Sequence, residues 1–207
     1  MHIAIAGNIG SGKTTLTEML SKHFRWEPEY ESVDNNPYLA DFYEDMDRWA
    51  FHLQIYFLNS RIQQIRRIKD SDTTVIQDRT IYEDAHIFAA NLHQSGHINE
   101  RDYQNYLSIF NSMLDLVSPP DLLIYLRSDI PKLIERIQKR GRAFEDAMRI
   151  DYLKNLNEHY KDWIEGYDLG NLLIIDVNHM DFVKNEEDFA EILNKVDVEL
   201  FGLFSSQ

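Results

Sequence analysis

The sequence predicts an α/β fold in which a five-stranded parallel sheet carries helices on both faces. Four short apolar runs, rich in Ile, Leu and Val, alternate with long helical segments along the 207-residue chain. The runs do not alternate apolar with polar residues, which is typical of strands covered on both faces. Strands and helices that alternate along a chain favour a parallel sheet. We expect a single domain over residues 1–207, because this length lies in the single-domain range.

The expected strands are the four apolar runs and one weaker segment. They span Ile3 to Gly7, Thr74 to Gln77, Leu122 to Leu126 and Leu172 to Val177, with the weaker strand near Glu29 to Glu31. Pro119 and Pro120 end the helix that precedes the third run. Apolar residues at helical spacing predict a late amphipathic helix after Asn185, namely Phe189, Ile192, Leu193 and Val196.

Composition and charge exclude several classes of protein. The chain has no cysteine, which excludes disulfide frameworks and thiolate metal sites and fits a reducing cytoplasm. Its net charge of −14 is opposite to that of a typical polyanion-binding surface, so we expect no nucleic-acid partner. No apolar run approaches the roughly 20 residues of a membrane helix, and the start lacks the basic leader of a signal peptide. We therefore expect a cytoplasmic protein without a membrane partner.

A phosphate-binding motif follows the first expected strand. It reads Gly7-Asn8-Ile9-Gly10-Ser11-Gly12-Lys13-Thr14, matches G-x-x-x-x-G-K-[ST] in full, and opens a helix expected from Thr15 to Phe24. Glycines let backbone N–H groups point at phosphate oxygens, and the helix N-terminus adds partial positive charge. We expect Lys13 to bridge the β- and γ-phosphates of ATP and the Thr14 hydroxyl to ligate Mg²⁺. The motif identifies the donor and leaves the acceptor open.

Asp78 and Arg79 directly follow the second apolar run. Ligands of parallel sheets bind at the carboxyl ends of the strands, so this pair is expected beside the phosphate-binding loop. Asp78 would hold Mg²⁺ directly or through water, and Arg79 would bridge phosphate and acceptor. The alternative is a structural salt bridge that caps the next helix.

Basic residues crowd one short segment of this acidic chain, namely Lys132, Arg136, Lys139, Arg140 and Arg142. Lys132, Arg136 and Arg140 are spaced four residues apart and share one helix face. Gly141 is expected to end the helix between Arg140 and Arg142. We expect an arginine-rich lid over about residues 136–146 that closes on the triphosphate and excludes water. The alternative is ordinary surface charge on a solvated helix.

Several stretches resemble the deoxynucleoside kinase family, in the right order and over nearly the whole chain. They are Glu31-Ser32-Val33-Asp34-Asn35-Asn36-Pro37-Tyr38, Phe42-Tyr43-Glu44, Arg48-Trp49-Ala50-Phe51-His52-Leu53-Gln54, Asp78-Arg79-Thr80-Ile81-Tyr82-Glu83-Asp84 and Lys139-Arg140-Gly141-Arg142-Ala143-Phe144-Glu145. The chain looks most similar to the short bacterial members that act on purine deoxynucleosides. The resemblance implies phosphorylation of a deoxynucleoside 5′-hydroxyl by ATP with Mg²⁺, a role in nucleotide salvage, and a homodimer.

The chain departs from the family pattern at two positions. Many relatives read Glu-Pro-Val where this chain has Glu31-Ser32-Val33, and Asp78 stands where glutamate is common. The segments Tyr56 to Ile65 and Tyr103 to Val117 could supply a dimer face, and they could equally belong to the core.

The resemblance also implies roles for individual residues. Glu31 would be the general base that accepts the 5′-hydroxyl proton, with Arg79 and Lys13 completing the catalytic set. Gln54, Arg61 and Asp84 would grip the nucleobase beside Phe57, although an internal ion pair is the alternative for the two charged residues. The other implied contacts are Tyr43 and Glu145 with the sugar 3′-hydroxyl, Arg136 with the donor adenine near Asp181 and Phe182, and Arg79, Arg140 and Arg142 with phosphate or the 5′-oxygen. Thr15 would complete the ATP site.

Substrate choice is the least determined part of this interpretation. Gln54 can offer a donor–acceptor pair to adenine or cytosine, and we expect deoxyadenosine first, with deoxyguanosine and deoxycytidine as alternatives. A nucleoside monophosphate kinase, such as a thymidylate kinase, is disfavoured because Glu31 would repel an acceptor that already carries phosphate. A regulatory nucleotide-binding module without enzymatic activity would need no buried polar grip for a second ligand.

Overall fold

The computed structural model describes residues 1–31, 33 and 36–202, and its centre is a sheet of five parallel strands. The strands are β1 (His2–Gly7), β2 (Glu27–Glu29), β3 (Val75–Asp78), β4 (Leu122–Arg127) and β5 (Asn171–Asp176). They lie in the order β2-β3-β1-β4-β5. The α/β fold with a five-stranded parallel sheet is therefore confirmed. The weaker strand lies two residues earlier in the chain than expected, at Glu27–Glu29, and Glu31 follows it.

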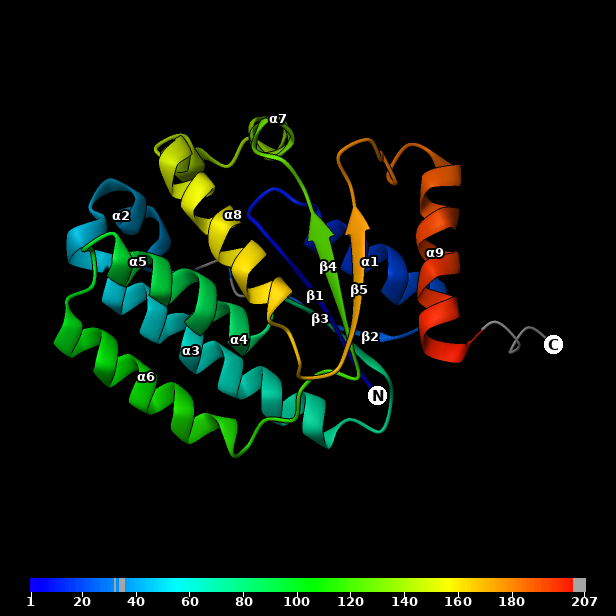
Figure 1. Cartoon of the computed structure of the whole chain (residues 1–207), viewed down its shortest axis with the longest axis horizontal. Coiled ribbons are helices and arrows are strands. Elements are labelled where there is room, and N and C mark those ends of the chain that lie inside the picture. Colours follow the sequence, from blue (N-terminus) through cyan, green and yellow to red (C-terminus); the bar gives the residue numbers. More distant parts are fainter. Residues whose placement is uncertain (32, 34–35, 203–207) are drawn as a thin grey trace.

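Helices cover both faces of the sheet (Figure 1). They are α1 (Lys13–Phe24), α2 (Leu39–Glu44), α3 (Met46–Asp70), α4 (Ile81–Glu83), the π-helix η1 (Asp84–Ala89), α5 (Ala90–Gln94), α6 (Glu100–Leu114), α7 (Ile130–Arg140), the short 3₁₀ turn η2 (Ala143–Glu145), α8 (Ile150–Glu165) and α9 (Glu186–Phe201). In Figure 1, α1 and α9 lie on one side of the strands, and α3, α5, α6 and α8 on the other. None of the helices in the described part of the chain has the length and apolarity that crossing a membrane requires.

Alternate side chains of β1 enter two separate cores. Ile3 and Ile5 pack toward α1 and α9, whereas Ala4 and Ala6 face the layer formed by α3, η1 and α8. This alternation follows from the two-residue period of a strand. Both sets are fully buried, as expected for a central strand of a doubly covered sheet.

The last strand differs from the expectation that all four apolar runs are covered on both faces. β5 pairs only with β4 and forms the edge of the sheet, and its Ile174 is 42% exposed. The Ile174 side chain is exposed to solvent because β5 lies at the edge of the sheet, although the strand is apolar in composition. The apolar run predicted the strand correctly but did not predict its place in the sheet.

All five strands are parallel, so their carboxyl ends meet at one edge of the sheet. Gly7 ends β1 at this edge, and the segments that follow β2 and β3 carry Glu31 and Arg79. Residues far apart in the sequence are brought together there, as is usual for ligand sites of open parallel sheets. Ser32, which stands where many relatives have proline, lies outside the described residues.

Truncation of a central core residue should cost far more stability than truncation at the sheet edge. Leu123 lies on β4, between β1 and β5, and is fully buried. We expect Leu123→Ala to lower the free energy of unfolding by about 2–5 kcal/mol. The matched variant Ile174→Ala on the exposed edge should cost about 1 kcal/mol or less. Urea denaturation with unchanged m-values measures both, and equal losses would contradict the assigned strand order.

Candidate active site

The phosphate-binding loop joins β1 to α1 at the carboxyl edge of the sheet. Gly10 has φ +84° and Gly12 φ +99°, a left-handed region that L side chains rarely adopt. A Cβ at Gly10 would lie 2.8 Å from the carbonyl oxygen of Leu133 in α7. Glycine therefore lets the loop pass close to α7 and still turn its N–H groups toward the start of α1, where an anion is stabilised.

Asn8 anchors this loop to α8. Its Nδ2 donates to Leu153 O at 3.1 Å and to Asn157 Oδ1 at 3.0 Å, and its Oδ1 accepts from the N–H of Ile9 at 2.8 Å. Lys13 Nζ donates to the main-chain oxygen of Asn8 at 3.1 Å. Burial, followed by repulsion from Arg79, lowers the pKa of Lys13 to about 8. An anionic phosphate beside Lys13 would stabilise its charged form.

Thr14 and Asp78 form a pair of oxygen ligands beside the loop. Thr14 Oγ1 donates to Asp78 Oδ2 at 2.5 Å, and the other carboxylate oxygen, Oδ1, is buried without a hydrogen-bond partner among the described residues. A carboxylate and a hydroxyl suit Mg²⁺, which is usually held by one or two protein oxygens together with substrate phosphates. The residues present therefore fit the ion that the sequence predicted at Thr14 and Asp78.

A cavity extends from the phosphate-binding loop to α3. Lys13 and Thr14 line one end, and Gln54, Phe57 and Asp84 line the other. The charged and polar residues that also line this cavity are Glu31, Arg79, Tyr43, Arg140, Arg142 and Glu145. At the far end, Gln54 is 2% exposed and its Oε1 has no hydrogen-bond partner in the described part of the chain. A buried amide oxygen without a partner is costly, which indicates that this end receives a polar ligand.

Arg79 lies at the centre of the site in an unusual backbone conformation, with φ +70°. Its Nη1 donates to the Tyr160 hydroxyl at 2.7 Å, and its guanidinium lies 4.4 Å from the ring centre of Phe88. Strained backbone of this kind persists only where surrounding contacts enforce it, and it gathers at functional sites.

Glu83 provides several of the contacts that hold Arg79 in this conformation. One of its carboxylate oxygens accepts from Tyr160 at 2.7 Å and from the N–H of Gly7 at 3.3 Å, and the other accepts from the N–H of Thr80 at 2.9 Å. Thr80 and Glu83 thus form the capping box of α4. The salt bridge considered as the alternative for Arg79 is present, since its Nη1 lies 3.6 Å from Glu83 Oε1 in α4, but the cap of this helix comes from Thr80 and Glu83.

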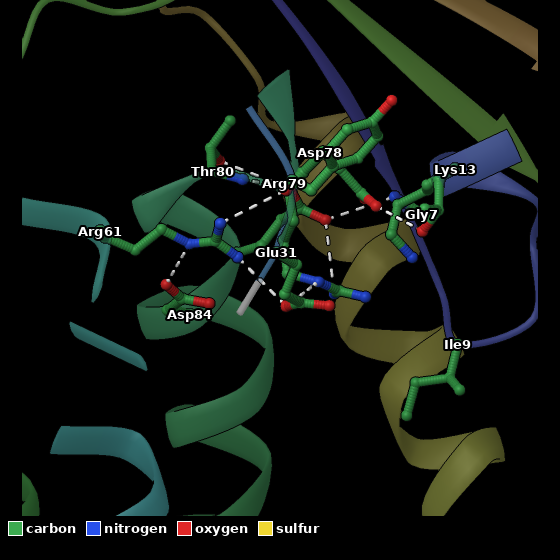
Figure 2. A network of polar contacts seen from close by, with 12 residues as sticks. Gly7, Ile9, Lys13, Glu31, Arg61, Asp78, Arg79, Thr80 and Asp84 are labelled. Atoms are coloured by element: carbon green, nitrogen blue, oxygen red, sulfur yellow. Dashed lines mark hydrogen bonds and ion pairs between the residues drawn. The ribbon is translucent and has the colours of Figure 1, made fainter. Parts of the chain in front are cut away.

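Glu31 lies between two buried guanidinium groups (Figure 2). Its Oε1 is 2.8 Å from Arg79 Nε, as an ion pair without hydrogen-bond alignment, and it accepts a hydrogen bond from Arg61 Nη2 at 3.1 Å. Burial acts to raise the pKa of Glu31, but Arg79, Arg61 and Lys13 together outweigh it and lower the pKa. Glu31 is therefore ionised at neutral pH.

Arg61 lies behind the cavity wall. It is 1% exposed, and its Nε donates to Asp84 Oδ2 at 2.8 Å. Asp84 and Glu31 line the cavity, whereas the guanidinium that joins them is packed behind both. The structure thus contains the internal ion pair considered for Arg61 and Asp84, and this pair presents the Asp84 carboxylate to the cavity.

The segment predicted as a lid, residues 136–146, begins in α7 and continues beyond its end. Gly141, at φ +64°, ends the helix, which confirms the predicted break between Arg140 and Arg142. Arg140 forms an ion pair with Glu145 and lines both this cavity and the adjacent one. Tyr43 stacks on Phe144 with ring centres 5.9 Å apart, and burial, then Tyr152 and Glu145, raise its pKa well above the usual value.

A second cavity lies on the other side of the phosphate-binding loop. Among its lining residues are Gly12, Thr15, Lys132, Arg136, Lys139, Arg140, Asp181 and Phe182. Arg136 donates to the main-chain oxygens of Ser11, Val177 and Met180 at 2.8–3.1 Å. Phe182 is buried against the loop, since a Cβ at Gly12 would lie 3.0 Å from its ring. Both residues support the loop as well as lining the cavity.

Sequence reasoning missed four residues that shape the site, namely Gln64, Glu83, Phe88 and Tyr160. Glu83 had a local signal, because Thr80 and Glu83 are spaced as a capping box. Phe88 lies on the π-helix η1, whose extra residue per turn alters the face that each side chain occupies, so helical spacing misplaces it. Tyr160 comes from α8, 81 residues after Arg79, and the sequence contains no signal for that contact.

Comparison with known proteins identifies the family. The model of the family described as deoxynucleoside kinase matches residues 3–201. Together with the phosphate-binding loop and the cavity beside it, this match shows a phosphotransferase with an alcohol acceptor. The chain belongs to the deoxynucleoside kinase family, and the resemblance stated from the sequence is confirmed.

Similar proteins include bacterial kinases that are named for deoxyadenosine, deoxycytidine or deoxyguanosine. The chain is 37% identical over 198 residues to the deoxyadenosine/deoxycytidine kinase of Bacillus subtilis strain 168, covering 94% of this chain and 90% of that protein. It is 39% identical over 207 residues to the deoxyguanosine kinase of Lactobacillus johnsonii, covering 96% and 92%. A structure of the deoxyadenosine kinase from M. mycoides, with the products dCMP and a flexible dCDP bound, superposes with a TM-score of 0.85 at 31% identity, covering 95% and 99%.

Removal of the Tyr160 hydroxyl should loosen Arg79 without disturbing the core. Tyr160→Phe deletes the group that contacts both Arg79 and Glu83, so we expect kcat to fall roughly tenfold, which corresponds to about one hydrogen bond. Tyr125 stacks on Tyr160 with ring centres 5.7 Å apart, and its hydroxyl makes no hydrogen bond with the described residues. Tyr125→Phe should therefore leave kcat unchanged. Steady-state kinetics tests this, and equal effects of the two changes would exclude the proposed hold on Arg79.

Proposed function

We propose that this chain transfers the γ-phosphoryl group of ATP to the 5′-hydroxyl of a deoxynucleoside in nucleotide salvage, with deoxyadenosine as the preferred acceptor. One observation carries the proposal. The ionised Glu31 lies in one cavity with Lys13 and Thr14 of the phosphate-binding loop, opposite the buried polar groups of Gln54 and Asp84. An uncharged acceptor placed between these two ends would bring its hydroxyl to the carboxylate and its base to the polar groups.

The proposed reaction is a direct in-line transfer. The 5′-oxygen forms a bond to the γ-phosphorus while the bond from that phosphorus to the β,γ-bridging oxygen breaks, which releases ADP. Glu31 accepts the hydroxyl proton, and Lys13 and Arg79 stabilise the charge on the transferred group. Mg²⁺ held by Thr14 and Asp78 would neutralise phosphate charge when bound. The protein supplies position and electrostatic stabilisation.

The remaining site residues have roles that follow from where they line the two cavities. In the acceptor cavity, Tyr43 and Glu145 would bind the sugar 3′-hydroxyl, while Phe57 and Phe88 would enclose the base. The donor would extend from the loop residues Gly7 to Thr15 into the second cavity, near Arg136, Asp181 and Phe182. Arg140 borders both cavities, and with Arg142 it would contact phosphate as residues 136–146 close as a lid.

Base preference is supported by the polar end of the cavity. Gln54 has an acceptor without a partner and Asp84 presents a carboxylate, so the amino group of adenine would find two acceptors there. The same reasoning admits the amino groups of cytosine and guanine, and relatives named for all three bases are similar to this chain. Thymine has no amino group and offers only its N3–H as a donor, so it would leave at least one of these two acceptors without a partner.

We further propose that residues 1–207 work as one kinase domain in the cytoplasm and as a homodimer. Leu58, Tyr106 and Phe110, from the two segments considered for a dimer face, are buried inside the subunit. The outer side of α6 would therefore have to supply the contact, and in Figure 1 this helix lies at the outer limit of its layer. Light scattering coupled to size exclusion would measure the mass.

An acceptor panel tests the proposed function. Labelled ATP is offered with each of the four common deoxynucleosides and with deoxyadenosine monophosphate. We expect deoxyadenosine to give the highest kcat/KM and the monophosphate to give no product, because the ionised Glu31 repels a second phosphate. Preferred phosphorylation of the monophosphate would overturn the proposal. Preference for thymidine would overturn the roles of Gln54 and Asp84.

Glu31→Gln isolates the general base. The amide keeps the shape of the carboxylate, so acceptor KM should change little, whereas kcat should fall by roughly 10²-fold or more. Because Arg79 and Arg61 lower the pKa of Glu31, the carboxylate stays ionised through mildly acidic pH. The kcat of the wild type should therefore not fall through protonation of Glu31 between about pH 7 and 5. A near-wild-type kcat in Glu31→Gln would remove this residue from the chemistry.

A further inference from the structure

The hydrogen bonds of Arg61 are almost all used inside the protein. Its Nε donates to Asp84, its Nη2 donates to Glu31, and its Nη1 donates to Gln64 Oε1 at 2.7 Å and to the main-chain oxygen of Asp78 at 3.3 Å. A guanidinium has five N–H groups, so at most one is left for a ligand. Arg61 therefore joins the carboxylate at the base end of the cavity to the carboxylate at the reacting end (Figure 2).

Gln64 forms hydrogen bonds with Arg61 and with the backbone next to Glu31. Its Nε2 donates to the main-chain oxygen of Tyr30 at 2.6 Å, directly before Glu31, and its Oε1 accepts from Arg61. Oε1 also accepts from Gln77 Nε2 at 3.1 Å. Tyr30 O can only accept and Arg61 can only donate, so one orientation of the Gln64 amide satisfies all three contacts. Gln64 is 1% exposed and is not among the described residues that line the cavity.

We propose that Gln64 is a positioning residue that holds the catalytic carboxylate and the base-reading carboxylate in fixed relation to each other. Through Tyr30 it sets the path of the backbone into Glu31, and through Arg61 it sets the places of Glu31 and Asp84. The identity of the nucleobase is thereby transmitted to the reacting end of the cavity. Discrimination between deoxynucleosides then resides in kcat as well as in KM. This inference rests on the proposed function of Glu31 and Asp84.

The neighbouring Gln77 provides a matched control. It is also a buried glutamine, 2% exposed, on β3. Its amide contacts Gln64 and the ring of His2, at 2.9 Å, and lies one hydrogen bond further from Arg61 and Glu31. Gln64→Met and Gln77→Met thus remove the same chemical group from adjacent buried positions, and only the first removes contacts to Tyr30 and Arg61.

The test compares steady-state kinetics of the wild type and both variants for deoxyadenosine and for a poorer deoxynucleoside, after correction for the folded fraction. We expect Gln64→Met to lower kcat for deoxyadenosine by roughly 10- to 100-fold, to leave the KM for ATP unchanged and to reduce the kcat ratio between the two acceptors. Gln77→Met should keep that ratio and a kcat within roughly threefold of the wild type. A merely structural role would lower activity equally for all acceptors.

A second variant separates the two contacts of Gln64. Gln64→Glu keeps an acceptor for Arg61 but has no donor for Tyr30 O, so we expect it to lose kcat while retaining acceptor selectivity. Equal kcat and equal selectivity in Gln64→Met and Gln77→Met would overturn the inference, as would lost selectivity in Gln64→Glu. Absence of turnover in the wild type with every deoxynucleoside would instead overturn the proposed function, so the two failures are distinguishable.

Discussion

The site depends on one buried carboxylate held between two guanidinium groups. Glu31 comes from the segment after β2, Arg61 from α3 and Arg79 from the end of β3, and each would be costly to bury alone. Because the three charges compensate one another, their positions are interdependent. The reacting end of the cavity, the base end and the path of the backbone at Tyr30 are consequences of this arrangement.

Three buried cations lie among four carboxylates at this centre, and Arg142 adds positive charge near Glu31 from the cavity wall. Lys13, Arg61 and Arg79 meet the four buried or half-buried carboxylates Glu31, Asp78, Glu83 and Asp84. Burial raises the pKa of Glu83 and of Asp84, whereas the two arginines keep that of Glu31 low. Among these three carboxylates, Glu31 alone has a lowered pKa, because its cationic neighbours outweigh the effect of burial. Glu31 is also the residue proposed as the catalytic base. Asp78 accepts a hydrogen bond from Thr14 through Oδ2, and its Oδ1 has no hydrogen-bond partner among the described residues. A divalent cation bound beside these two residues would add positive charge.

The surrounding fold gives these charges a rigid support. Asn8 of the phosphate-binding loop forms a hydrogen bond with α8, and Arg79 forms a hydrogen bond with Tyr160 of the same helix. Glu83 connects the two, since it contacts Gly7 of the loop and Tyr160. One helix, α8, thus fixes the position of the phosphate-binding loop relative to Arg79, the arginine proposed to stabilise the transferred phosphoryl group. Alignment of this kind is most of what phosphoryl transfer requires of a protein.

Much of the fold and of the donor site could be predicted from local sequence. The apolar runs predicted the parallel strands, and the glycine motif predicted the loop at Gly10 and Gly12. Gly141 predicted the end of α7. Each of these features depends on periodicity or on steric effects between residues close in the sequence. The family resemblance gave the class of reaction, and it is also the source of the acceptor residues that are proposed above.

Tertiary structure alone decided which side chains meet. Arg61 had been expected to grip the base, yet folding places it behind Asp84 and joins it to Glu31 and Gln64. The edge position of β5 and the contact of Tyr160 with Arg79 also had no local signal. Hydrogen bonds between residues distant in sequence are set by the packing of whole helices on the sheet, and spacing along one helix cannot reveal them.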